Sequence, residues 1–163
     1  MFLFQSLHIV HWPQVRAIYL EGIATGQATF QQSAPSWEEW DRGHLPHSRI
    51  VALIDNKVAG WAALSHVSTR PVYKGVAEVS VYVAEMYRGN GLGFQLLRQL
   101  VQESEQNGIW TLQSSIFPEN TASVRIHEQN GFRIMGRRER IAQMNGIWRD
   151  TIIMERRSKI VGN

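Results

Sequence analysis

Several stretches of the chain alternate hydrophobic and polar residues or are continuously hydrophobic, and both are strand patterns. The clearest is Glu78–Val83, where three valines alternate with Ser80 and Tyr82. Strands are also predicted at Ile50–Ile54, Val58–Ser65, Ile109–Ile116, Phe132–Ile141 and Trp148–Arg156, with turns at Asp55-Asn56-Lys57 and Met144-Asn145-Gly146.

Helical spacing separates these strands. Trp12-Pro13 opens a helix that extends to about Ile23, since proline is tolerated in a first turn. Ser36, with Glu39 three residues later, matches a capping box and starts a short helix. Two more helices are predicted, one from Phe94 through Val101 and one from about Thr121 to Gln129, which Asn130-Gly131 ends. Without repeats or an internal linker, the pattern predicts one mixed α/β domain over residues 1–163.

Composition narrows the class of protein. A chain of 163 residues is long enough for a single core, and the absence of cysteine excludes disulfides and cysteine-ligated zinc. No basic segment precedes the hydrophobic start, and Arg16 and Glu21 soon interrupt it, so we expect a cytoplasmic protein with neither a signal peptide nor a membrane partner. The net charge of +3 suits a polyanionic cofactor but is too small to indicate nucleic-acid binding.

A glycine-rich turn joins the strand at Glu78–Val83 to the following helix. Its sequence is Arg88-Gly89-Asn90-Gly91-Leu92-Gly93. Glycines at alternate positions allow a tight backbone, and a helix N-terminus adds free N–H donors and partial positive charge, which together suit a phosphate group. Phe94 stands where a dinucleotide fingerprint needs its third glycine, and the Gly-Lys-Ser/Thr end of a P-loop is missing. The alternative is a turn whose glycines only make the bend.

Arg-x-x-Gly-x-Gly after a valine-rich strand resembles the motif with which GNAT acetyltransferases bind the pyrophosphate of acetyl-CoA. The spacing of Asn120, Ser123, His127 and Gly131-Phe132 resembles the second half of the GNAT signature. Further stretches resemble the phosphinothricin acetyltransferase-like branch: Ala28-Thr29-Phe30, Arg70-Pro71-Val72-Tyr73, Glu78–Val83, Ser123–Glu128 and Trp148-Arg149-Asp150. The resemblance covers nearly the whole chain. It implies a GNAT fold, a splayed mixed sheet of six or seven strands flanked by helices.

The resemblance also implies acetyl-CoA as co-substrate and no metal. The residues that it places at the cofactor are Val81, Tyr82, Val83, Arg88, Gly89, Asn90, Gly91, Leu92, Gly93, Phe94, Asn120 and Ser123. Asn120 has a second possible role as a helix cap. A strand N–H near Val81 or Val83 is the expected donor to the thioester oxygen.

Two residues are candidates for catalysis. An α-amine has a pKa near 8 and must lose a proton before it attacks, and Glu78 matches the glutamate proposed as base in this branch. The alternative for Glu78 is a surface carboxylate at a strand entry. His127 stands where many members have the tyrosine that protonates the departing thiolate, and a histidine packed near the cofactor without a chemical role is equally compatible.

The acceptor amine is less well defined. Phe30 and Tyr73 match residues that line the acceptor pocket in this branch, although two aromatic residues covering the core from loops would give the same pattern. Gln31 departs from the acidic residue that relatives often carry there, which leaves the substrate open.

Weaker patterns were weighed against simpler explanations. His44-x-x-His47 lacks a third ligand and is interpreted as a pair of solvated loop residues. Arg137, Arg138 and Arg140 are interpreted as charges on a solvated strand face. Trp148 is expected either in the core or in a dimer interface.

The resemblance therefore predicts an acetyl-CoA-dependent N-acetyltransferase that acts on a small amino acid or analogue and forms a homodimer. Two alternatives stay open at this point: an acetyltransferase for peptides or protein N-termini, and an acyl-CoA-binding sensor without catalysis.

Overall fold

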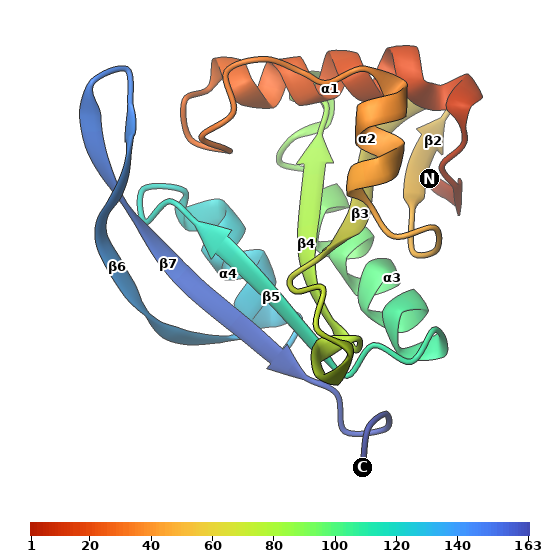
Figure 1. Cartoon of the computed structure of the whole chain (residues 1–163). Helices are drawn as coiled ribbons and strands as arrows, with labels where there is room; N and C mark the ends of the chain where they lie inside the picture. The colour runs from red at the N-terminus through yellow and green to blue at the C-terminus, as the bar shows by residue number, and fades with distance from the viewer.

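One mixed sheet runs through the computed structural model, which describes residues 1–163 (Figure 1). Its strand order is β1-β2-β3-β4-β5-β7-β6, and β4 and β5 are the only parallel neighbours. The strands are β1 (Leu3–Ser6), β2 (Ile50–Ile54), β3 (Lys57–His66), β4 (Val76–Val83), β5 (Thr111–Ile116), β6 (Arg133–Met144) and β7 (Ile147–Arg157). The predicted mixed sheet is confirmed, with seven strands.

Four α-helices connect the strands: α1 (Trp12–Ala24), α2 (Trp37–Gly43), α3 (Leu92–Gln106) and α4 (Thr121–Gln129). Single 3₁₀ turns lie at η1 (Ile9–His11), η2 (Pro71–Tyr73) and η3 (Glu85–Tyr87). The predicted start signals hold, since Pro13 lies in the first turn of α1 and the Ser36 hydroxyl accepts the N–H of Glu39 at 3.2 Å. Strand β1 is the one strand that the hydrophobic pattern did not predict.

Two hydrophobic cores sandwich the first four strands. Helices α1 and α2 pack on one face around Trp12, Val15, Trp40 and Trp61. Helix α3 packs on the other face, where its leucines meet inward side chains of β2, β3 and β4. Because both faces are covered, β3 is buried without interruption from Val58 to Leu64, which explains its continuous apolar sequence.

Strands β4 and β5 separate after a short paired segment. They pair only where Val76–Glu78 lies beside Thr111–Gln113, and beyond this point they diverge (Figure 1). The rest of β4 therefore has a free edge toward β5. This gap positions the site described below.

Strands β6 and β7 form a long hairpin on the far side of the gap. All side chains from Arg133 to Arg140 are exposed, and the β6–β7 register shifts between Arg138 and Ala142. Trp148 is 53% exposed, so its interpretation as a core residue was wrong.

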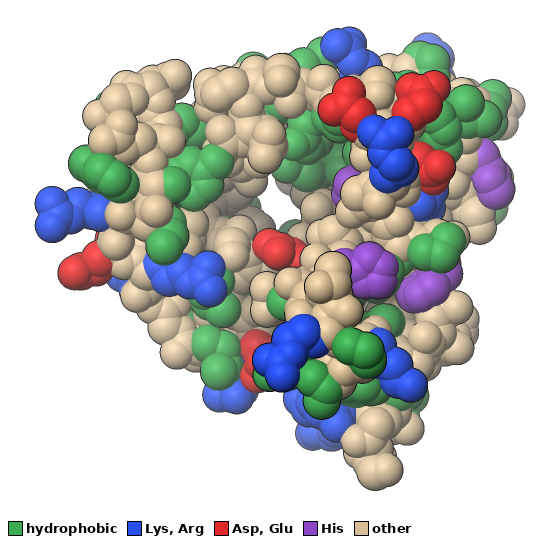
Figure 2. Space-filling view, in the orientation of Figure 1, with side chains coloured by type: hydrophobic (Ala, Val, Ile, Leu, Met, Phe, Trp, Pro, Cys, Tyr) green, Lys and Arg blue, Asp and Glu red, His purple; other side chains and the backbone are tan.

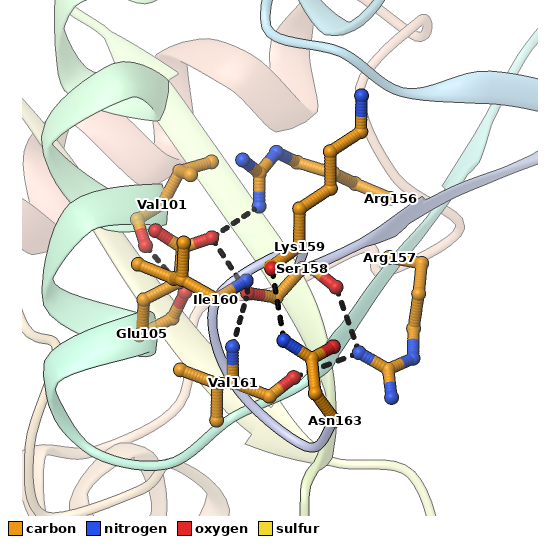
Figure 3. A network of polar contacts seen from close by, with 10 residues as sticks. Val101, Glu105, Arg156, Arg157, Ser158, Lys159, Ile160, Val161 and Asn163 are labelled. Atoms are coloured by element: carbon orange, nitrogen blue, oxygen red, sulfur yellow. Dashed lines mark hydrogen bonds and ion pairs between the residues drawn. The ribbon is translucent and has the colours of Figure 1, made fainter.

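The end of β7 is tied to α3 by a polar network (Figure 3). Arg156 and the Ser158 hydroxyl both donate to Oε1 of Glu105, each at 2.9 Å. The Ser158 hydroxyl in turn accepts the N–H groups of Ile160 and Val161 at 3.2 and 3.1 Å. These contacts fix the open side of the sheet to the covered side below the gap.

Candidate active site

A cavity of about 450 Å³ lies in the gap between β4 and β5. Figure 2 shows it as a hollow between the β6–β7 hairpin and the part built from α1 and β4, with acidic surface at its edge. Its lining comes from the loop after α1, from β4, β5 and α4, and from the hairpin. The lining residues used below are Gln27, Phe30, Gln31, Glu78, Ser80, Val81, Tyr82, Phe117, Asn120, Ser123, His127, Arg138, Ile141, Ala142 and Thr151.

Glu78 lies where β4 and β5 part. It is the last β4 residue paired with β5, and its carboxylate forms no ion pair. Burial raises the pKa of Glu78 above its usual value, while the nearby Gln113 amide and the Arg138 guanidinium act in the opposite direction. A half-buried, unpaired carboxylate with a raised pKa is suited to take a proton from a bound group. The interpretation of Glu78 as a simple surface carboxylate does not describe this environment.

The free edge of β4 presents backbone N–H donors to the cavity. Ala84 donates to the carbonyl of Ala59 on β3 at 2.8 Å. Backbone groups alternate sides in an antiparallel pair, so the N–H groups of Val81 and Val83 point away from β3. Pairing with β5 has ended by then, and these donors have no strand acceptor. They are geometrically suited to hold a carbonyl or amide group that enters the gap.

The glycine-rich turn lies between β4 and α3. Gly89 and Gly91 have φ values of +81° and +77°, a backbone conformation that favours glycine. The N–H groups of Gly89, Asn90 and Gly91 take no backbone acceptor. Gly93 serves another purpose, since a Cβ there would lie 3.2 Å from Ile126 of α4. The turn thus presents clustered free N–H groups at the start of a helix, which fits a phosphate group.

Other residues of the turn contribute less by their side chains. The Arg88 side chain donates through Nε to the carbonyl of Val83 at 3.3 Å. Leu92 is buried in the core on the α3 face, so only its backbone N–H is available. Phe94 is half-buried on α3. The turn and Val83 lie outside the lining of the cavity, whereas Val81 and Tyr82 belong to it.

His127 is buried on α4, and its ring packs edge-on against Phe132. Nδ1 donates to the carbonyl of Ser123 at 2.7 Å, so in the neutral ring Nε2 is the acceptor. Nε2 is buried without a partner. Burial lowers the pKa of His127, with the Ser123 carbonyl acting in the opposite direction. A neutral ring of this tautomer accepts a hydrogen bond at Nε2 and has no proton there to give.

Asn120 caps α4, as one of its two predicted roles required. Its Oδ1 accepts the N–H of Ser123 at 3.2 Å, and its Nδ2 donates to the carbonyl of Gln27 at 3.1 Å. Asn120 and Ser123 both line the cavity beside His127. The cap therefore also joins α4 to the loop after α1.

Arg149 of β7 holds that loop over the cavity. Its guanidinium donates to the carbonyl of Gly26 at 3.0 Å and to the side chain of Gln27 at 2.8 Å, and it pairs with Glu119 at 3.3 Å. It also lies 4.0 Å from the centre of the Phe117 ring. Phe30 packs edge-on against Phe117 at 4.9 Å. Arg149 therefore contacts both the loop that carries Gln31 and the ring of Phe117, on which Phe30 packs.

Tyr73 is not brought together with Phe30. It lies on η2, is 45% exposed, packs against the Arg70 guanidinium and is absent from the cavity lining. Arg138 is exposed, as a solvated strand charge should be, and it also lines the cavity. The cluster of three arginines was a signal for this site, but their sequence did not show which of them faces inward.

The histidine pair is also not as predicted. His44 is half-buried, stacks on Trp40 at 4.1 Å and bonds the Trp40 carbonyl through Nδ1 at 2.7 Å, so it is not a solvated residue. The structure has no group of three or more His, Cys, Asp or Glu side chains placed to hold a metal ion. Its helices are too short or too polar to cross a membrane.

Comparison with known proteins gives the same class as the geometry. The family model described as "Acetyltransferase (GNAT) family" matches residues 11–132. An L-methionine sulfoximine/L-methionine sulfone acetyltransferase of Pseudomonas aeruginosa is 33% identical over 149 residues, which make up 88% of this chain and 87% of that protein. A phosphinothricin N-acetyltransferase of Alcaligenes faecalis is 34% identical over 154 residues, covering 88% of this chain and 76% of that protein.

A solved structure extends the similarity to nearly the whole fold. The phosphinothricin acetyltransferase (Pat) of Sinorhizobium meliloti in complex with AcCoA has a TM-score of 0.88 and 25% identity, and covers 99% of this chain and 90% of that chain. A split mixed sheet with a glycine-rich turn behind its central strand thus defines a GNAT fold. The chain belongs to the GNAT acetyltransferase family, in the phosphinothricin and methionine sulfoximine acetyltransferase-like branch, and is an acetyl-CoA-dependent N-acetyltransferase.

Proposed function

We propose that this enzyme transfers the acetyl group of acetyl-CoA to the amine of a small free amino acid or a close analogue. The observation that carries the proposal is the unpaired carboxylate of Glu78, which lies in a cavity of about 450 Å³ beside the free edge of β4. Relatives named for methionine sulfoximine, methionine sulfone and phosphinothricin support this acceptor class.

Acetyl-CoA fits the residues present. The free N–H groups of Gly89, Asn90 and Gly91 and the N-terminus of α3 hold its pyrophosphate, and the free edge of β4 holds the pantetheine arm. Asn120 and Ser123, at the start of α4, form the cavity wall beside this arm. The N–H of Val81 or Val83 stabilises the negative charge that develops on the thioester oxygen, an interaction worth about 3 kcal/mol in other acyl transfers.

Glu78 and His127 have different roles in the reaction. Glu78 takes the proton of the attacking amine, directly or through one water, because the amine is mostly protonated at neutral pH. His127 accepts a hydrogen bond at Nε2 from a bound group and orients it, since its neutral ring carries its proton on Nδ1. The CoA thiolate leaves without protonation by this ring.

The acceptor enters from the side of Phe30 and Gln31. Gln31 is exposed at the cavity, and it puts a neutral amide where the resemblance to this branch implies an acidic residue, which favours acceptors without a second positive charge. Residues 1–163 act as a single catalytic domain in the cytoplasm. Exposed Ile134, Met135 and Trp148 on the hairpin provide the surface for a homodimer.

The test is CoA release from acetyl-CoA against a panel of acceptors. The panel contains phosphinothricin, methionine sulfone, methionine sulfoximine, the common amino acids and a short peptide, each with wild type, Glu78→Gln and Glu85→Gln. We expect turnover of at least one free amino acid and a kcat about 10²–10⁴-fold lower in Glu78→Gln, the usual contribution of a general base. Glu85 is exposed on η3, outside the cavity lining, so its variant should match wild type.

Other outcomes would point elsewhere. Turnover of the peptide alone would assign the enzyme to peptide acetylation. Tight binding of acetyl-CoA without turnover of any amine would favour an acyl-CoA sensor. Equal activity of wild type and Glu78→Gln would remove Glu78 as the base.

A further inference from the structure

Strand β6 carries four arginines, of which Arg133 and Arg137 form ion pairs. Of the two whose guanidinium groups are unpaired, Arg138 lines the cavity and Arg140 does not. Nε of Arg137 pairs with Asp150 at 2.7 Å, and the backbone N–H of Arg140 donates to the same carboxylate at 2.8 Å. None of the five ion pairs in the structure includes Arg138. Asp150 therefore compensates the charge beside Arg138 on the strand and leaves the guanidinium of Arg138 without a partner.

An irregularity in β6 brings this region to the cavity. The register against β7 shifts between Arg138 and Ala142, and Arg140 within this segment has a φ of +44°. Arg138, Ile141 and Ala142, which lie at this register shift, all line the cavity. The bulge thus turns a solvent-facing part of the hairpin into one wall of the site.

Arg138 and Glu78 line the same cavity from opposite sides of the gap. Glu78 comes from β4 and Arg138 from β6, with β5 and β7 between them in the sheet. Their charges influence each other, because the guanidinium acts to lower the pKa of Glu78, but the two do not form an ion pair. The cavity therefore presents a free cation and a free anion with space between them.

We propose that Arg138 binds the α-carboxylate of the acceptor while Glu78 faces its α-amine. A guanidinium forms paired hydrogen bonds with a carboxylate, and a zwitterionic amino acid carries its two charges on one carbon. This inference rests on the proposed function and sharpens it: the acceptor is an α-amino acid with a free carboxylate. Peptides and amino-acid amides lack that carboxylate and are poor acceptors.

The experiment compares L-methionine sulfone with its α-carboxamide as acceptors. Arg138→Met and Arg138→Lys are measured beside Arg137→Met, a control that removes a neighbouring arginine of the same strand. Wild type should prefer the carboxylate form. Arg138→Met should lower kcat/KM for the carboxylate on the order of 10- to 100-fold, as expected for a lost charge-assisted hydrogen bond.

The lower kcat/KM of Arg138→Met should come from a higher KM for the carboxylate acceptor. The kcat/KM for the amide should stay the same. Arg138→Lys should recover part of the lost activity, since lysine keeps the charge but loses the paired geometry. Arg137→Met should retain the preference of wild type for the carboxylate. Arg138 is exposed and unpaired, so its variants should melt with wild type, which separates recognition from folding.

Several results would overturn the inference. These are equal losses for carboxylate and amide, a similar loss in Arg137→Met, or an increase in KM for acetyl-CoA alone. If wild type acetylates other free amino acids but shows no preference for carboxylate over amide, the role of Arg138 fails while the proposed function stands. If wild type acetylates no free amino acid, both fail.

Discussion

The sheet is built differently on the two sides of the gap. On the β1–β4 side, helices cover both faces, and β3 is buried from Val58 to Leu64. On the β5–β7 side, the hairpin leaves Arg133 to Arg140 exposed and contains two register irregularities. The covered side fixes its backbone by packing on both faces. The hairpin is fixed by its ladder, by Met154 of β7, which is buried in the core on the α3 face, and by polar contacts with α3 and the loop after α1.

This difference corresponds to a division of tasks at the site. The covered side supplies Glu78 and the free N–H groups of β4, which need exact placement for chemistry. The hairpin supplies Arg138, Ile141 and Ala142 to the cavity wall, where we propose that the acceptor binds. We infer that changes in the hairpin can alter the acceptor without loss of the core, because the two sets of residues lie on structurally separate parts.

Truncation of one buried side chain on the covered side and one exposed side chain on the hairpin should give the largest difference in the free energy of unfolding. Leu96 on α3 is fully buried, so Leu96→Ala should lower the free energy of unfolding by about 2–5 kcal/mol through lost burial and a cavity. Ile134 on β6 is 49% exposed in the single chain, so at protein concentrations too low for a dimer Ile134→Ala should change it by less than about 0.5 kcal/mol. Urea unfolding measures both. A large, concentration-dependent loss in Ile134→Ala would show that a second copy covers the hairpin.

Arg149 tests the connection between the two sides. Arg149→Met should lower the free energy of unfolding by about 1.5–3 kcal/mol, because the half-buried guanidinium holds the Gly26–Gln27 segment. KM for the acceptor should increase as well, since that loop carries Phe30 and Gln31. Arg137 has an exposed ion pair with Asp150, so Arg137→Met should cost below about 1 kcal/mol.

Urea unfolding with steady-state kinetics measures both arginine variants. Equal stability of the two variants, with unchanged KM in Arg149→Met, would mean that the loop is held by other contacts.

Glu78→Gln should change the free energy of unfolding least, and it should increase this free energy rather than lower it. The pKa of Glu78 is raised on folding, so the unfolded carboxyl ionises first as pH increases above its ordinary 4.5, and the free energy of unfolding falls until the folded pKa is passed. Glu78→Gln removes this cost, and at neutral pH it should raise Tm by about 1–2 °C, since partial exposure keeps the gain below about 1 kcal/mol.

Thermal unfolding of wild type and Glu78→Gln at pH 4 and pH 7 measures the difference. At pH 4 the two Tm values should converge. A lower Tm for Glu78→Gln at neutral pH would show that Glu78 stabilises the fold and carries no functional cost.

Much of the covered side could be predicted from local sequence. The alternation at Glu78–Val83, proline in the first turn of α1 and the Ser36 cap are short-range features, and each is present in the structure. Strand β1 could not be predicted, because its LFQS sequence has no amphipathic pattern and it forms only by pairing with β2, which lies far along the chain.

The acceptor side was harder to predict for a physical reason. Tyr73 and Arg138 lie on a 3₁₀ turn and at a strand bulge, and neither local period determines where such a residue points. Asp150, which pairs with Arg137 and not with its neighbour Arg138, lies on the opposite strand of the hairpin. Glu78, by contrast, belongs to a regular strand that the local pattern predicted, and it lines the cavity.

The free edge of β4 also determines how the protein behaves before it meets its substrate. The amide protons of Val81 and Val83 have no strand acceptor and should exchange with deuterium quickly, whereas those of Ser80 and Tyr82, which face β3, should exchange slowly. Unpaired edges also invite strand addition by other chains and hence aggregation. A ligand that occupies these donors closes the edge, so we expect acetyl-CoA to slow this exchange and to lengthen the time that the protein stays dispersed.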